Sequence, residues 1–124
     1  MPKKLFDYGE YGFLFNMYAN SITQEIGGVT SIFEYLRQIV EKVGVDDKGE
    51  PIFKETPKAK KIILHYFYGA AVAYFDHKGI KRNVTLSDVS DWLEELGEVE
   101  AMEIYAESLG TPKNSEAPKE TGQN

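Results

Sequence analysis

The segment from Thr56 to Gly79 constrains the fold more than any other part of the chain. Thr56 followed by Pro57 is a strong helix start, because threonine can cap a free backbone N–H and proline lacks one. Gly79 is typical of a helix end. The residues from Ile62 to Phe75 are apolar on nearly every side. We therefore expect a helix over about 56–78 that lies in the middle of a bundle or keeps one face for a partner.

Four further helices are predicted from apolar residues at helical spacing and from capping residues, over 8–26, 31–43, 86–96 and 98–109. Ser31 with Glu34 forms a capping box. No segment alternates convincingly as a strand, although Lys3–Phe6 is compatible with a short extended piece. Residues 45–55 form a polar loop that Ile52 and Phe53 are expected to anchor on the core. The predicted fold class is all-α, a compact bundle of about five helices.

The chain of 124 residues is long enough for one domain and a short tail. We assign residues 1–110 to the helical domain. Residues 111–124 contain no Leu, Ile, Val or aromatic residue, and we expect them to be disordered. The longest apolar stretch is shorter than the roughly 20 residues that span a bilayer, and no targeting segment is visible. The expected location is the cytoplasm.

The sequence offers little material for catalysis or metal binding. It has no cysteine, which excludes disulfides, thiolate metal sites and cysteine nucleophiles. The two histidines, His65 and His77, lie on the same predicted helix about 18 Å apart by helical rise, so they cannot share one metal ion. No phosphate-binding glycine pattern or nucleophile motif is present. We expect a protein without enzymatic activity, cofactor or metal.

Charge is distributed unevenly along the chain. The net charge is −6; residues 54–82 carry a net +5, and residues 83–110 a net −8. Both segments can be solvated helix faces, or the acidic helices can meet a basic partner or the basic segment of a second copy. The alternative function is a small regulatory adaptor that binds nucleic acid or another protein. Nucleic acid would be bound through the basic residues Lys58, Lys60, Lys61, Lys81 and Arg82.

Aromatic side chains project in all directions around the central helix. They can belong only to the core, or to the core and a protein-binding surface, since aromatic residues are enriched in both. The candidate protein-binding surface combines aromatic residues of this helix with acidic residues of the next: Phe67, Tyr68, Tyr74, Phe75, Asp88, Asp91, Glu94 and Glu95.

The run from Ile62 to Leu96 joins an apolar helix with a small-residue waist (Tyr68-Gly69-Ala70-Ala71) to a Lys/Gly-rich break and then to Val84-Thr85-Leu86-Ser87-Asp88-Val89-Ser90-Asp91-Trp92-Leu93-Glu94-Glu95. This arrangement resembles the tail assembly chaperones of long-tailed bacteriophages and prophages. That family commonly shows a G-L … L-T-x-E-x-V-x-x-x-L-D pattern after a helix-turn-helix. Tyr11–Ile26 before Gly27-Gly28 fits its opening helix. Many members open with a short β-hairpin, for which residues 1–10 give little sequence support.

The resemblance covers about residues 11–97. It implies that the protein binds the tape measure protein in the host cell cytoplasm during tail morphogenesis, keeps that long apolar helical protein soluble and helps recruit tail-tube subunits. It also implies self-association, and a longer form made by frameshifting near the end of the gene.

Overall fold

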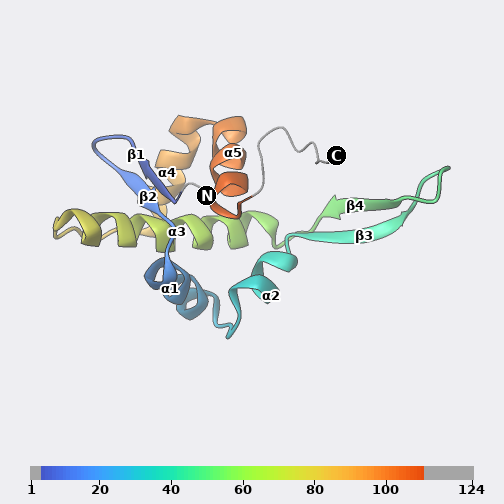
Figure 1. The fold of residues 1–124 in the computed structure, drawn as a ribbon, viewed down its shortest axis with the longest axis horizontal. Helices are drawn as coiled ribbons and strands as arrows, with labels where there is room; N and C mark the ends of the chain where they lie inside the picture. The colour runs from blue at the N-terminus through green and yellow to red at the C-terminus, as the bar shows by residue number, and fades with distance from the viewer. Residues whose placement is uncertain (1–3, 111–124) are drawn as a thin grey trace.

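The computed structural model of the chain describes residues 4–110. These residues form five helices and two antiparallel sheets of two strands each. The all-α prediction is therefore wrong, because segments predicted as helix (12–14 and most of 40–45) and as loop (51–55) form strands, as does Leu5–Asp7, which overlaps the short extended piece considered at Lys3–Phe6. Figure 1 shows helix α3 in the middle, α1 and α2 on one side of it, and α4, α5 and the first hairpin on the other. The tail predicted to be disordered, 111–124, lies outside the described residues.

Helix α3 (Ala59–Lys78) is the predicted central rod, and it begins later than the sequence indicated. The Thr56 hydroxyl donates a hydrogen bond to the carbonyl oxygen of Gln38 at 2.6 Å, so it does not cap α3. Gly79 ends the helix with a φ of 73°, a left-handed conformation that favours a residue without Cβ. Because α3 is covered from several sides, it can be apolar around most of its circumference.

The first sheet is a hairpin of β1 (Leu5–Asp7) and β2 (Gly12–Leu14). The predicted helix over 8–26 is therefore wrong in its first half. Tyr11, Phe13 and Phe15 are buried at a spacing of two, which is the period of a strand. In the sequence the same window also matches the helical spacing, because Leu14 and Tyr18 supply apolar residues at the other positions.

Helix α1 (Met17–Gly27) follows the hairpin directly. The Asn16 side chain caps it by accepting a hydrogen bond from the N–H of Ala19 at 2.8 Å. α1 packs across α3 where α3 has Gly69, whose missing Cβ lets the backbone of Ala19 approach. The small-residue waist of α3 thus serves packing between α1 and α3.

Helix α2 (Ile32–Arg37) has the predicted Ser31 cap but only six residues. Beyond Arg37 the sequence prediction is wrong, both in continuing the helix to residue 43 and in placing a loop over 45–55. The chain there forms β3 (Val40–Val45) and β4 (Pro51–Glu55), a hairpin that projects beyond the amino-terminal end of α3 (Figure 1). A reversal of direction at 46–50 lets the two strands pair without help from the core.

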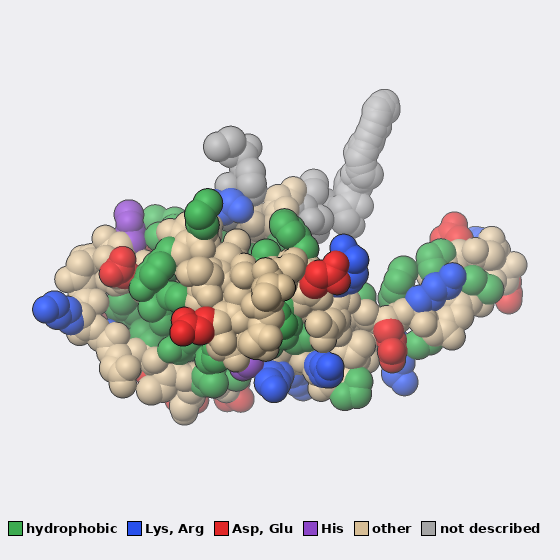
Figure 2. Space-filling model, turned by 90° about the horizontal axis from the view of Figure 1, so that it is seen from below, with side chains coloured by type: hydrophobic (Ala, Val, Ile, Leu, Met, Phe, Trp, Pro, Cys, Tyr) green, Lys and Arg blue, Asp and Glu red, His purple; other side chains and the backbone are tan. Residues whose placement is uncertain are grey.

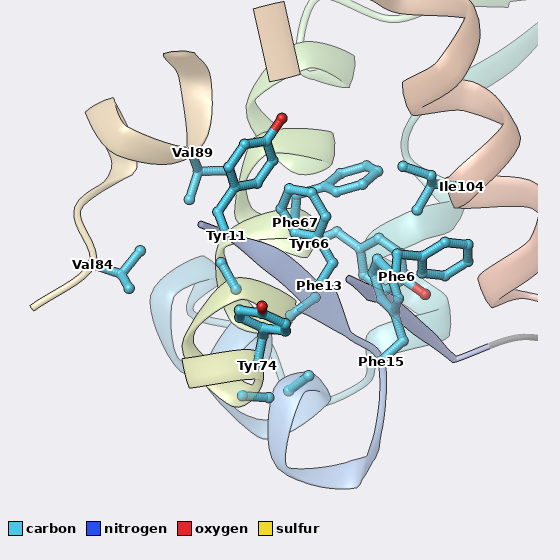
Figure 3. Close-up of a cluster of buried hydrophobic side chains, with 14 of the residues drawn as sticks. Phe6, Tyr11, Phe13, Phe15, Tyr66, Phe67, Tyr74, Val84, Val89 and Ile104 are labelled. Carbon is cyan, nitrogen blue, oxygen red and sulfur yellow. The ribbon is translucent and has the colours of Figure 1, made fainter. Parts of the chain in front are cut away.

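Helices α4 (Leu86–Leu96) and α5 (Glu98–Ser108) complete the fold and agree with the sequence prediction. Thr85 and Asp88 form a full capping box at the start of α4. The core lies between α3, the first hairpin and these helices, and it is rich in aromatic rings (Figure 3). Its largest fully buried apolar side chains are Tyr74, Phe13, Phe67, Ile62, Ile104 and Val89.

Candidate protein-binding surfaces

Three of the four aromatic residues in the predicted binding surface lie inside the folded domain. Phe67, Tyr74 and Phe75 are buried, and Tyr68 is half-buried against the core. Phe67 makes an edge-on contact with the ring of Phe13, with 5.0 Å between the ring centroids. These side chains hold α3 against the first hairpin and α4, so they do not form a surface patch.

Tyr74 also links α3 to the first hairpin through a polar contact. Its hydroxyl donates a hydrogen bond to Oδ1 of Asp7 at 2.7 Å, and Nζ of Lys78 lies 2.7 Å from Oδ2 of the same carboxylate. The hydrogen-bonded Lys78 holds the pKa of Asp7 well below its usual range, with help from the N–H of Gly9. Burial, with Asp7 second, raises the pKa of Tyr74 to about 12. The cluster ties the hairpin to the end of α3.

The acidic residues predicted for the same surface divide between structural and exposed positions. Asp88 caps α4 and lies 3.5 Å from the Arg82 guanidinium, and its hydrogen bond from the N–H of Thr85 is the first cause of its lowered pKa. Asp91, Glu94 and Glu95 are exposed on α4. They are available for a partner, whereas Asp88 serves the helix start.

A groove between α1, α2 and α5 collects exposed apolar side chains. It has a volume of about 490 Å³. Met17 is 86% exposed and Phe33 is 70% exposed, far more than is usual for such large apolar residues. We call it the α1–α2–α5 groove, and its lining residues are Lys4, Phe15, Asn16, Met17, Asn20, Ile32, Phe33, Leu36, Tyr66, Ser108 and Leu109. Figure 2 looks at the molecule from the α1–α2 side and shows hydrophobic side chains at that surface.

A second groove lies between α3, α4 and α5. It has a volume of about 510 Å³, an apolar floor and charged residues at its edges. We call it the α3–α4–α5 groove, and its lining residues are Glu55, Lys60, Ile63, Leu64, Ser90, Leu93, Glu94, Gly97, Glu98, Ala101 and Met102. Glu94 is the residue of the predicted binding surface that lies here.

The third surface is the projecting hairpin of β3 and β4, which we call the arm (Val40–Glu55). Every residue of both strands is exposed. The expected anchoring of Ile52 and Phe53 on the core is wrong: Phe53 is 59% exposed, and Ile52 is exposed as well. An isolated hairpin is only marginally stable in water, and exposed apolar residues on it are typical of a surface that another chain covers.

His65 of α3 has a structural role in the packed interior of the domain. His65 is buried, and its Nδ1 shares a hydrogen bond of 2.8 Å with the Tyr35 hydroxyl. Burial lowers the pKa of His65, with Lys61 as a smaller cause. Within residues 4–110, no cluster of three or more His, Asp or Glu side chains is placed to hold a metal ion.

The basic residues of the nucleic-acid alternative lie toward opposite ends of α3. Lys58, Lys60 and Lys61 are exposed near its start. Beyond its end, the Arg82 guanidinium lies 5.1 Å from the centroid of the Trp92 ring and pairs with Asp88. Arg82 is thus engaged within the domain, and the structure does not gather these residues into one basic surface.

Over the part of the chain that the structure describes, none of the helices has the length and apolar character needed to cross a membrane. No protein-family model matches the sequence, and comparisons with curated proteins and with solved structures give no match.

Proposed function

We propose that this protein binds an apolar helix of another polypeptide in the α1–α2–α5 groove and has no catalytic activity of its own. The observation that carries the proposal is the pair of large apolar side chains, Met17 and Phe33, that are mostly exposed and line one groove. Burying both would contribute roughly 3–5 kcal/mol before the cost of association. Association itself costs about 4 kcal/mol or more, so the two side chains serve as anchors and further contacts along the groove must add to them.

The chemistry of the groove favours a helix as the occupant. Residues of α1, α2, α3 and α5 line it, and an amphipathic helix can place side chains three and four residues apart into such a groove. Met17 has a flexible thioether side chain that adapts to irregular apolar surfaces. The groove has a polar rim formed by Asn16, Asn20 and Lys4. Such a rim suits a partner helix whose other faces stay in water.

The resemblance to tail assembly chaperones supplies the identity of the partner. We propose that the helix belongs to a phage tape measure protein, and that the chaperone keeps it soluble until tail-tube subunits surround it. The opening hairpin β1–β2 adds support, because many members of that family begin with one. The exposed acidic residues Asp91, Glu94 and Glu95 would keep the complex soluble and attract basic tail-tube surfaces.

The test is co-expression of the chain with an apolar helical segment of a tape measure protein from a long-tailed phage. We expect the segment to remain soluble and to co-purify. In the double variant Met17→Glu and Phe33→Glu, two carboxylates would enter the apolar contact, and co-purification should be lost. Val99→Glu is the matched control, because Val99 is 74% exposed and does not line the groove.

Two results would contradict the proposal. If the segment stays insoluble with the wild-type chain, the tape measure protein is refuted as the partner. Retention of the segment by the double variant would refute the groove as its site. Binding of duplex DNA that weakens steeply with salt, in place of the segment, would favour the adaptor alternative.

A further inference from the structure

The arm and the α3–α4–α5 groove are two unpartnered surfaces that lie next to each other on the chain. Glu55 ends β4 and also lines the groove. We propose that two copies of the protein exchange arms, each arm lying in the α3–α4–α5 groove of the other copy. This inference concerns a different surface from the proposed partner site and does not depend on it.

The arm is well formed at both ends although every residue of its two strands is exposed. At the tip, Oδ1 of Asp46 accepts hydrogen bonds from the N–H groups of Lys48 and Glu50, both at 2.9 Å. At the base, the N–H of Thr56 donates to the carbonyl oxygen of Ile39 at 2.9 Å. A hairpin held in this way presents its side chains in fixed positions, as a docking element requires.

The register of the arm separates its side chains into two unlike faces. Lys42 pairs with Phe53, and Val45 with Pro51, and residues paired across strands point to the same side. One face, which we call the arm face, therefore carries Val40, Lys42, Val45, Pro51, Phe53 and Glu55. The opposite face carries the pair Glu41 and Lys54 and the pair Gly44 and Ile52. The arm face is the more apolar, and only Lys42 interrupts it away from the base.

The groove complements the arm face in shape and charge. Its floor is apolar, with Ile63, Leu64 and Leu93, and it is open along one side. Its charged lining residues are Glu55, Lys60, Glu94 and Glu98, so acids outnumber the one lysine, and Glu94 and Glu98 can pair with the Lys42 ammonium of an incoming arm face. An apolar strand pair with one cation thus fits an apolar floor with an acidic edge.

A second copy is the occupant because, within one chain, the only arm residue that lines the groove is Glu55 at the base of the arm. The arm points away from the body, beyond the end of α3 (Figure 1). A two-fold axis near the bases of the two arms, placed so that the Glu55 carboxylates of the two copies stay apart, would lay both arms over both grooves in one self-complementary contact. The six residues of the arm face and the eleven that line the groove, with Glu55 common to both, give sixteen per copy. That number approaches the roughly 20–30 residues a side of a standard stable interface.

The first test is the oligomeric state of the full chain, measured by analytical ultracentrifugation over a range of concentrations. We expect a dimer for the wild type. In the variant Val45→Glu with Phe53→Glu, the dissociation constant should rise roughly tenfold or more, because two buried anchors become charged. The control Ile52→Glu changes the opposite face and should leave the dimer intact. A monomeric wild type, or equal effects in variant and control, would overturn the proposal.

The second test uses the absence of cysteine from the chain. Phe53→Cys and Met102→Cys are made in separate preparations, which are mixed and oxidised. Arm exchange predicts a disulfide-linked heterodimer between the arm of one copy and the groove of the other. If disulfides form only between two copies of the same variant, or do not form at all, arm exchange is wrong. Both residues are exposed, so neither substitution disturbs the core.

Discussion

Gly69 offers the sharpest test of how the body of the domain is packed. It lies in α3 at the crossing with α1, and a Cβ there would collide with the carbonyl oxygen of Ala19 and the hydroxyl of Thr23. The backbone oxygen cannot rotate away, so α1 would have to move. Thr23 is fully buried, and its hydroxyl lies 3.1 Å from the carbonyl oxygen of Ala19 and 3.2 Å from that of His65.

Two opposing effects determine the result of Gly69→Ala. Alanine favours the helix over glycine by about 1 kcal/mol. Overpacking costs about 1–3 kcal/mol, and loss of the buried hydrogen bond of Thr23 adds about 1–2 kcal/mol. We therefore expect a net destabilisation of about 1–4 kcal/mol, or a fall in Tm of roughly 4–16 °C for a domain of this size.

The assay is urea unfolding followed by circular dichroism and by fluorescence of Trp92, the only tryptophan. Gly44→Ala is the control, because a Cβ at Gly44 meets no atom within 4 Å. Its free energy of unfolding should change by no more than about 0.5 kcal/mol. If Gly69→Ala is more stable than the wild type, the higher helix propensity of alanine outweighs any collision of its Cβ. The close contact between α1 and α3 then does not exist.

Three further substitutions test the core and its polar contacts. Phe13→Ala should lower the free energy of unfolding by about 3–5 kcal/mol in a urea titration, because the ring is fully buried; a loss below about 1 kcal/mol would contradict its position. His65 has a lowered pKa in the folded state, so the unfolded chain binds the proton more readily and stability falls as pH drops below about 6.5. The fall in stability that comes from protonation of His65 should be absent in His65→Gln when thermal melts of each protein at pH 7.5 and 5.5 are compared. Asp7 also has a lowered pKa, so its stabilising effect is present above its unfolded pKa of about 3.9 and is lost as pH falls below it. The stability difference between wild type and Asp7→Asn should therefore shrink below pH 4 in acid titrations, and a constant difference would refute the role of the carboxylate.

The helices that carry strong local signals could be predicted from the sequence. α4 has a complete capping box, and α3 has a left-handed glycine at its end, so local chemistry alone defines them. The start of α3 was misplaced because Thr56 bonds to Gln38, eighteen residues earlier in the chain. A sequence pattern does not reveal such a distant acceptor.

The strands could not be predicted because each signal was short or ambiguous. β1 and β2 have three residues each, and their buried positions coincide with a helical stripe in the same window. β3 and β4 are exposed on both faces, and the irregular pairing between Lys42 and Gly44 interrupts the short alternation of their side chains, so no strand pattern is recognisable in the sequence. The turn-like residues Asp47-Lys48-Gly49 between two short segments with apolar residues are the local feature that is compatible with a hairpin.

The binding surfaces show the limit of reasoning from apolar content. Phe67 and Tyr74 were assigned to a surface because α3 is apolar all round, yet its neighbours cover them. Phe33 is the converse case, an apolar residue that is exposed. It lies outside the apolar stripe that Ile32 and Leu36 form on the same helix. A large apolar residue on the polar side of a helix was the feature that could have identified the α1–α2–α5 groove.

The central claim is that Met17 forms part of the binding site for a partner helix. NMR of the methionine methyl groups tests this claim most directly. The chain has three methionines, and Met17 and Met102 lie in different grooves. With methyl-labelled methionine, titration with the apolar tape measure segment should shift and broaden the Met17 signal and leave that of Met102 unchanged. A shift confined to Met102, or no shift at saturating segment, would contradict the account.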